Sequence, residues 1–356
     1  MRVNNTKKNN ILPITLVIPH RNRADEIKRC LQSLQKSYAI PQTIFIIDDC
    51  SYNRQQQLLG EIVSEFSNIS IKLFCFNQHV GTSDAKNLGL LYSTTPYIWF
   101  LDSDTEIINP DALELGFQLL EKHLDIGVVG SEIVEDRNLQ RYLRETYLLK
   151  SLWSTFIHHP INNNFKKEVD ITPTCNFLTR TNLIKEIGGF HSKLENGEDK
   201  LACLQIRKLK YKIIIDSQFG VLHHQSPTAR AQFLKRVRVT FRDIAFIYGA
   251  TNKFWKLITY PVICIQCLNK LYKNNMEMYH VIGHHNDNPE IMQTPKIYDF
   301  FKKLLTLIKI LIQYVLANKT YMSIKGFYFH ISNRNNFHNF EDNMRKLPMK
   351  LKEIET

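Results

Sequence analysis

Short, mostly apolar runs alternate with helical patterns over the first 130 residues of the chain. The apolar runs, which are typical of buried strands, occupy residues 14–19, 43–47, 71–76 and 97–101. Helical spacing of apolar side chains follows at residues 24–37, 58–66 and 84–92, with a further helix expected after Asn109-Pro110-Asp111. Strands that alternate with helices predict an α/β fold with a doubly wound, mostly parallel sheet and flanking helices.

The pattern becomes mixed beyond residue 130 and then almost entirely helical. Strands are predicted at residues 174–179, 213–215 and 220–222, and helices at residues 182–187 and 198–208. We therefore predict three parts: a polar tail at residues 1–11, the α/β domain at residues 12–230, and a basic, mainly helical region at residues 231–356.

Polar clusters follow three of the predicted strands directly. They are Pro19-His20-Arg21-Asn22, Asp48-Asp49 and Asp102-Ser103-Asp104. In open parallel sheets, ligands bind beyond the carboxyl ends of the strands. The sequence therefore predicts a ligand site at this edge of the sheet.

The acids of these clusters suggest particular chemistry. Asp102 and Asp104 could bind one divalent cation, because magnesium takes one or two carboxylates and completes its shell with water and phosphate. An acidic turn is the alternative. Asp49 could accept a hydrogen bond from a base or a ribose. Two adjacent acids after an apolar strand would otherwise repel each other unless they are paired, and the alternative is a solvated turn in which Ser51 caps the next helix.

Three further motifs carry candidate chemistry. Residues 81–89 open a helix whose amino end, with Lys86, suits an anionic ligand, although no Walker A or GxGxxG pattern is present. Asp199 starts another helix, where the helix dipole argues against a raised pKa but allows a general base. His223 follows a short strand and could bind a metal or a phosphate. Helix capping and a structural histidine are the respective alternatives.

Net charge separates the two large parts of the chain. The formal charge is +12, and residues 231–356 hold 19 Lys+Arg against 9 Asp+Glu. An amphipathic helix at residues 300–317 could lie on an anionic membrane, or pack on the α/β domain or a second subunit. No nucleic-acid partner is expected, because no recognised module accompanies this charge.

Seven cysteines, mostly in apolar runs, fit reduced thiols, and the Cys264-to-Cys267 spacing more often reflects packing than zinc binding. The start of the chain lacks an apolar leader, and no run reaches the length of a spanning helix. These features predict a cytoplasmic protein, with a peripheral contact on the inner face of the membrane as one interpretation.

The order of the motifs resembles the family-2 glycosyltransferases of the GT-A fold. The resemblance covers about residues 12–230. The segments that carry it are VIPHRNR (17–23), IIDDCS (46–51), GTSDAKNLG (81–89), FLDSDTEI (100–107), IGGF (187–190), GEDKLACLQIRKLKYKI (197–213) and VLHHQS (221–226). Two departures are His20-Arg21, where the family usually has Thr-Tyr, and Lys86, where it often has Arg.

The resemblance implies a role for each candidate residue. Residues that would bind the nucleotide sugar are Pro19, Arg21, Asp49, Lys86, Asp102 and Ser103. Metal ligands would be Asp102, Asp104 and His223, for Mn²⁺ or Mg²⁺. Asp199 would be the base that deprotonates the acceptor.

The resemblance also implies a reaction. A sugar would pass with inversion from a nucleoside-diphosphate sugar, with UDP favoured, to a hydroxyl of a glycan or lipid-linked acceptor, in cell-surface polysaccharide or glycolipid synthesis. Two alternatives remain. A sugar-phosphate nucleotidyltransferase would typically have a Gly-rich loop where this chain has His20-Arg21-Asn22-Arg23. A non-catalytic scaffold would not need Asp49, Asp102, Asp104 and Asp199 together.

Overall fold

The computed structural model describes residues 10–135 and 165–224, apart from residues 193, 195 and 196, together with isolated positions from residue 242 onward. The chain divides into two compact units, one of residues 1–150, 154–233 and 336–356, the other of residues 151–153 and 234–335. In the second unit, Asp243, Phe246 and Ile247 are buried. The predicted amphipathic helix at residues 300–317 and the Cys264–Cys267 pair lie outside the described residues.

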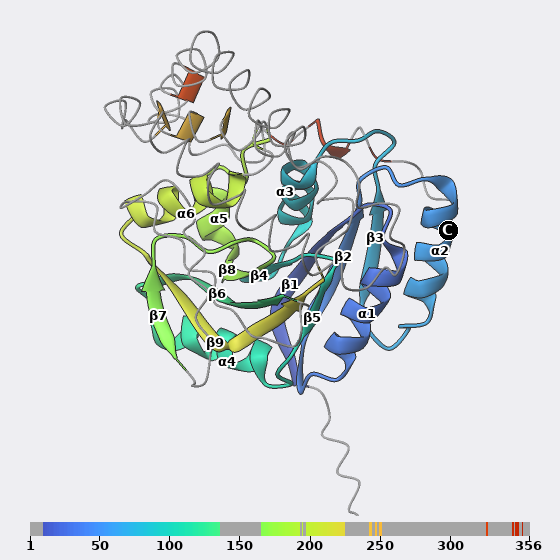
Figure 1. The fold of residues 1–356 in the computed structure, drawn as a ribbon, viewed down its shortest axis with the longest axis horizontal. Helices are drawn as coiled ribbons and strands as arrows, with labels where there is room; N and C mark the ends of the chain where they lie inside the picture. Colours follow the sequence, from blue (N-terminus) through green and yellow to red (C-terminus); the bar gives the residue numbers. More distant parts are fainter. Residues whose placement is uncertain are drawn as a thin grey trace, which may run out of the picture. The chain divides into compact units, whose positions relative to one another are not determined.

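The described part of the first unit contains one nine-stranded sheet (Figure 1). Its strands are β1 (Asn10–His20), β2 (Ala39–Asp48), β3 (Ile71–Cys75), β4 (Tyr97–Leu101), β5 (Thr105–Ile107), β6 (Ile126–Glu135), β7 (Lys166–Val169), β8 (Asn176–Arg180) and β9 (Lys212–His223). The strand order is β3-β2-β1-β4-β8-β6-β9-β5, with β7 paired to β9. The helices are α1 (Ala24–Gln35), α2 (Asn53–Ser64), α3 (Thr82–Tyr92), α4 (Ala112–Lys122), α5 (Thr181–Glu186) and α6 (Glu198–Lys208).

The first half of the sheet has the predicted doubly wound form. Strands β3, β2, β1 and β4 are all parallel. The chain moves outward from β1 to β3 and then returns to β4 on the other side of β1, which makes a topological switch point between β1 and β4. Beyond β4 the sheet is mixed, because β8 runs antiparallel to both β4 and β6, while β6 and β9 are parallel. The predicted α/β class with flanking helices is confirmed.

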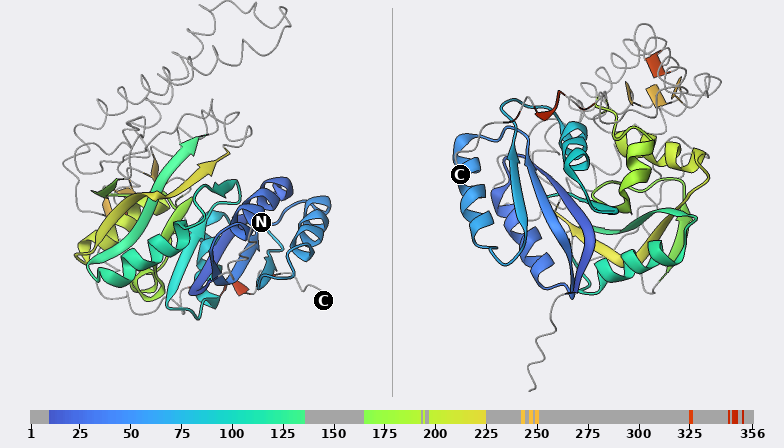
Figure 2. Two further views of the ribbon diagram at one scale, coloured as in Figure 1. Left: turned by 90° about the horizontal axis from the view of Figure 1, so that it is seen from below. Right: turned by 180° about the vertical axis from the view of Figure 1, so that it is seen from behind.

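Helices cover both faces of the sheet around β1 (Figure 2), and successive side chains of this strand point to opposite faces. Ile14, Leu16 and Ile18 are fully buried in the main core with the apolar faces of α1, α2 and α4. Val17 points to the opposite face and contacts α3 at Gly89. Because both faces of β1 are covered, side chains that point to either face must be apolar. This explains the continuous apolar run in the sequence of β1.

Three strands, β5, β6 and β7, were not predicted, and one strand was predicted as two. Strand β5 has three residues, β7 has the polar sequence KKEV, and β6 carries Gly127 and Gly130. None of these patterns is strand-forming alone, so pairing with a neighbouring strand decides their conformation. The two short strands predicted at residues 213–215 and 220–222 form the single strand β9, which pairs with β5, β6 and β7.

The thiols agree with the sequence expectation within the described residues. Free cysteines there are Cys30, Cys50, Cys75, Cys175 and Cys203, and all but Cys50 are buried.

Among the helices that the structure describes, none has the length and apolar character needed to cross a membrane.

The close contact between α3 and β1 gives a prediction for stability. A Cβ at Gly89 would lie 2.4 Å from Val17 Cγ1, and a buried β-branched side chain cannot easily turn away. We expect Gly89→Ala to lower the free energy of unfolding by about 1–3 kcal/mol, measured by urea denaturation. The matched control is Gly60→Ala in α2, where nothing lies within 4 Å and a gain of up to about 1 kcal/mol is expected. Equal stability of the two variants would contradict this packing.

Candidate active site

The three polar clusters predicted at one edge of the sheet do meet there. They follow the carboxyl ends of β1, β2 and β4. His20 Nδ1, after β1, lies 2.9 Å from Asp48 Oδ1 at the end of β2. Arg23, on the same loop as His20, places Nη1 2.7 Å from Asp104 Oδ2 beyond β4. His20, at the end of β1, therefore contacts the cluster after β2. Arg23, on the loop that follows β1, contacts the cluster after β4.

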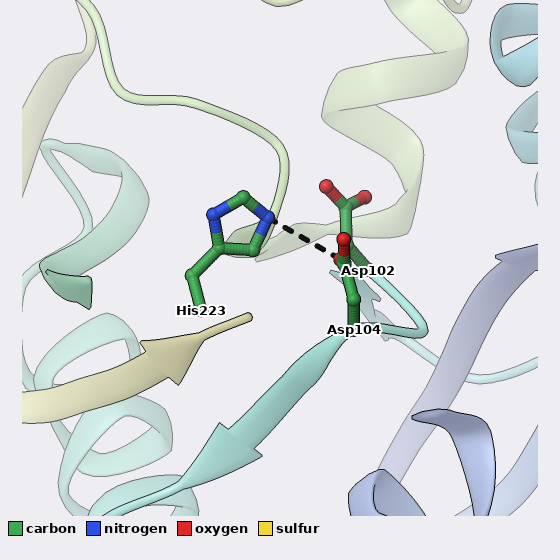
Figure 3. A group of neighbouring side chains, drawn as sticks. All are labelled: Asp102, Asp104 and His223. Carbon is green, nitrogen blue, oxygen red and sulfur yellow. Dashed lines mark ion pairs between the residues drawn. The ribbon is translucent and has the colours of Figure 1, made fainter. Parts of the chain in front are cut away.

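Asp102, Asp104 and His223 form a group that could hold a metal ion (Figure 3). Each offers one ligand atom, and these atoms all lie within 4.8 Å of one another. The short strand β5 creates this proximity, because it follows Asp104 directly and pairs antiparallel with β9, so that Thr105 lies opposite His223. His223 Nε2 is 3.3 Å from Asp104 Oδ1. The three predicted ligands are thus brought together by a strand that sequence reasoning did not find.

The donor atoms of this group fit a divalent cation. Asp104 Oδ1 is buried and makes no hydrogen bond of ordinary geometry among the described residues, and its near neighbour is His223 Nε2 at 3.3 Å, so this oxygen can still take a further ligand. Burial would raise the pKa of Asp104, but His223 and Arg23 outweigh it and hold that pKa below its usual range. Burial raises the pKa of Asp102. Two carboxylates with one imidazole are suitable ligands for Mn²⁺, and the carboxylates for Mg²⁺.

Arg23 is a site residue that sequence reasoning missed. Its guanidinium pairs with Asp104 and also lies 3.5 Å from Glu26. The sequence offered one signal, since Arg23 belongs to the VIPHRNR segment at the sheet edge. An isolated arginine before a helix is common, however, and its partner lies 81 residues away in the chain.

Asp48 is saturated by protein groups. It accepts hydrogen bonds from His20, from Gln56 Nε2 at 2.7 Å, and from both the backbone N–H and the hydroxyl of Ser51. Burial would raise the pKa of Asp48, but these hydrogen bonds outweigh it and hold the pKa below its usual range. The expectation that the adjacent acids need partners is confirmed. Ser51 does not cap the next helix as considered, because its hydroxyl binds Asp48 and accepts from Asn22 N–H.

Asp49 occupies the amino end of α3. Its carboxylate accepts from the backbone N–H groups of Val80 at 2.6 Å and Gly81 at 3.0 Å, and contacts His79 Nδ1 at 2.7 Å. Gly81 precedes the first residue of α3. These bonds hold the loop that leads into α3, and the binding of an anionic ligand at this helix end stays a prediction.

The polar side chains of α3 hold the segment that precedes and begins α6. Ser83 Oγ donates to Leu194 O at 3.2 Å. The Asn87 side-chain amide donates to Phe190 O at 2.7 Å and accepts from Phe190 N–H at 2.8 Å. The GTSDAKNLG motif therefore binds Phe190 and Leu194, which precede α6.

Lys86 is buried among protein groups, with only 1% of its surface exposed. Its Nζ lies 3.2 Å from Glu198 Oε1 and donates to the hydroxyl of Thr174. Burial would lower the pKa of Lys86, but the carboxylates of Glu198, Asp102 and Asp199 outweigh it and raise that pKa. Lys86 is therefore a permanent buried cation, and its direct contacts in this structure are with the protein.

Asp199, the predicted base, differs from expectation in its acidity. It lies in the first turn of α6, where Lys200 N–H donates to Oδ1 at 2.7 Å. Burial and the neighbouring Glu198 carboxylate raise the pKa of Asp199 to about 6. The expectation that the helix dipole would keep the pKa low is wrong, because loss of hydration and a like charge next door exceed the dipole effect.

The other predicted donor residues lie at the same edge. Pro19, near the end of β1, is partly exposed, and Arg21, just after β1, is exposed. Ser103, between the two acids, is buried. Their roles in binding a nucleotide sugar stay predictions.

Comparison with known proteins points to one family. Residues 15–188, just under half of the chain, match the model of glycosyl transferase family 2. With the glycosyltransferase relatives, this match supports a family-2 glycosyltransferase, as the motif order implied.

Individual relatives are distant. The teichoic acid poly(glycerol phosphate) polymerase of Staphylococcus epidermidis is 26% identical over 26% of this chain, which covers 13% of that protein. The processive diacylglycerol beta-glycosyltransferase of Mycoplasma genitalium is 22% identical over 73% of this chain and 71% of its own length. This chain thus spans only a small part of the first relative.

Solved structures share the fold. TarS 1–349 from S. aureus, in complex with UDP-GlcNAc, has a TM-score of 0.53 at 16% identity and covers 94% of this chain and 92% of its own. The mannosyltransferase PcManGT from Pyrobaculum calidifontis, in complex with GDP-Man and Mn²⁺, has a TM-score of 0.51 at 13% identity, covering 85% and 87%. At these identities the likeness shows the fold.

The raised pKa of Asp199 predicts a pH-dependent stability. Because the folded chain holds this proton more tightly than an ordinary aspartate does, the contribution to stability is complete below about pH 4 and is lost as the pH rises through about 6. Asparagine cannot ionise. We expect Asp199→Asn to match the unmodified protein at pH 4 and to be more stable at pH 8 by up to about 3 kcal/mol, measured by denaturant unfolding.

The control for this experiment is Asp125→Asn. Asp125 is exposed and pairs with Lys212 at 2.8 Å, which lowers the pKa of Asp125. This variant should gain no stability at pH 8. A gain in both variants would point to general charge reduction and would contradict the specific role of burial at Asp199.

Proposed function

We propose that this chain is an inverting, metal-dependent glycosyltransferase. It transfers a sugar from a nucleoside-diphosphate sugar to a hydroxyl group of a glycan or lipid-linked acceptor. The observation that carries the proposal is the meeting of Asp102, Asp104 and His223 at the carboxyl edge of the sheet, with ligand atoms within 4.8 Å, in a chain whose residues 15–188 match the model of glycosyl transferase family 2.

Asp102, Asp104 and His223 would hold Mn²⁺ or Mg²⁺, which supplies charge stabilisation for the diphosphate leaving group when bound. The buried Asp104 Oδ1, which faces His223 Nε2 at 3.3 Å and makes no hydrogen bond of ordinary geometry, supports this assignment. Arg23, 2.7 Å from Asp104 Oδ2, balances the negative charge of the acids.

Asp199 would accept the proton of the acceptor hydroxyl as that oxygen attacks the sugar carbon. A base must be ionised to act, and a pKa of about 6 leaves Asp199 ionised and basic at neutral pH. Attack from the side opposite to the leaving diphosphate inverts the configuration at the sugar carbon. Glu198 is the weaker candidate, because its carboxylate pairs with Lys86.

Pro19, Arg21 and Ser103 would contact the donor at the switch point, and Asp49 would shape its pocket by fixing the loop at residues 79–81. TarS and PcManGT were solved with UDP-GlcNAc and GDP-Man, respectively, which supports a nucleoside-diphosphate sugar. We favour UDP as the nucleotide.

The names of the curated relatives support an acceptor of the cell surface. They include a diacylglycerol glycosyltransferase and a teichoic acid polymerase. We propose synthesis of a polysaccharide or glycolipid on the cytoplasmic side, with the basic region at residues 231–356 contacting the membrane.

A nucleotide panel tests the donor class. The thermal midpoint is measured with UDP, GDP, dTDP and CDP, each with and without Mn²⁺. At 100 times Kd, binding to the folded state alone stabilises by about 2.7 kcal/mol, which gives a visible shift. We expect one diphosphate to raise the midpoint, and to do so only with Mn²⁺. Absence of any shift would contradict the proposal and favour a scaffold that retains the fold.

Two variants separate the base from the metal site. Asp199→Asn should lower kcat by about 10²–10⁴-fold and leave the Mn²⁺-dependent nucleotide shift intact, because only proton transfer is lost. Asp104→Asn should lose both turnover and the nucleotide shift. Asp125→Asn serves as the control with unchanged activity. If Asp104→Asn keeps its Mn²⁺ response, the metal assignment is wrong.

A further inference from the structure

The segment that leads into Asp199 is held by one face of α3. Ser83 binds Leu194 and Asn87 binds Phe190, both through uncharged hydrogen bonds. Lys86 lies between these two residues in the sequence and binds Glu198, which is adjacent to Asp199. Helix α3 therefore tethers this segment at three successive places.

Lys86 differs from its two neighbours because it carries charge. Glu198 is 8% exposed and Lys86 1% exposed, so the pair is almost completely removed from water. A buried ion pair contributes little net stability, since the cost of desolvation offsets the attraction. Uncharged side chains already serve as tethers at the two neighbouring positions. The charge of Lys86 therefore indicates a role beyond holding the segment before Asp199 in place.

The surroundings of Lys86 supply that reason. Its ammonium acts on the carboxylates of Glu198, Asp199 and Asp102, which belong to the base and metal parts of the site. Thr174, before β8, takes a further hydrogen bond from Nζ, and the ring of Phe190 lies 5.3 Å from it. The ammonium is thus held by Glu198, Thr174 and the ring of Phe190.

We propose that Lys86 is a positioning residue for the transfer reaction: it binds the Glu198 carboxylate at the start of α6 and so leaves Asp199 as the carboxylate of the pair that accepts the proton. This inference rests on the proposed function. It assigns Lys86 to the base rather than to the nucleotide. The proposal leaves the class of reaction unchanged. It implies that the buried Lys86–Glu198 pair shifts the pH range in which Asp199 acts as a base.

The proposal predicts opposite shifts for two variants. Besides burial, the charges that act on Asp199 are Glu198, which raises its pKa, and Lys200 and Lys86, which lower it. Burial raises the pKa of the Cys203 thiol, one turn along α6, so that group is uncharged. Glu198→Gln keeps the shape and removes the like charge, so the acidic limb of the kcat/KM profile should move to lower pH by about one unit. Lys86→Met should move it to higher pH, and the double variant should lie between the two.

Ser83→Ala is the matched control. It removes a tether from the same face of α3 without changing any charge, so it should lose stability while its acidic limb stays where it is in the unmodified protein. If Glu198→Gln also leaves the limb unmoved, Lys86 and Glu198 are merely structural and the proposal is overturned. Because Glu198→Gln is isosteric, this test stands even where Lys86→Met does not fold.

A second readout separates this proposal from the proposed function. The pH dependence of unfolding reports the titration of Asp199 without any substrate. We expect the stability lost as the pH rises through about 6 to be lost at a lower pH in Glu198→Gln. A shift in unfolding with no sugar transfer by the unmodified protein would support the charge coupling and contradict the transferase. Transfer with no shift in unfolding would contradict the coupling alone.

Discussion

The structure depends on neutralising several carboxylates that lie together in a buried position. Asp48, Asp49, Asp104 and Glu198 are each less than a tenth exposed, and an unpaired buried charge is costly. Each has a fixed partner from a distant part of the chain: His20 for Asp48, the loop at residues 79–81 for Asp49, Arg23 for Asp104 and Lys86 for Glu198. These pairs join the strands and helices at one edge of the sheet.

The degree of pairing divides these acids into two groups. Asp48 and Asp49 have both oxygens engaged, so their carboxylates hold loops in place. Asp104 retains one buried oxygen without a hydrogen bond of ordinary geometry, and Asp199 has a raised pKa. A metal ion and a proton are the species that such carboxylates take up. The chemistry of the proposed reaction therefore falls on the acids that the fold leaves incompletely satisfied.

Helix α3 links the two halves of the proposed site. It packs against β1 at Gly89, which carries no side chain to keep the helix away from Val17. On its other side, α3 holds the segment that contains Glu198 and Asp199. The position of Asp199, the proposed base, therefore depends on the same helix that contacts the central strand.

The sequence alone predicted the first half of the fold and the three residues, Asp102, Asp104 and His223, whose ligand atoms the structure places within 4.8 Å of one another. Apolar runs such as residues 14–19 fold as strands because both sheet faces are covered, and acids placed after parallel strands must share an edge. Tertiary structure decided the rest. Strands β5 and β7 form because β9 pairs with them. Lys86 finds Glu198 across 112 residues of sequence, and the acidity of Asp199 depends on burial. Local patterns specify which surfaces are apolar, whereas hydration and charge at a given atom depend on every segment that folding brings next to it.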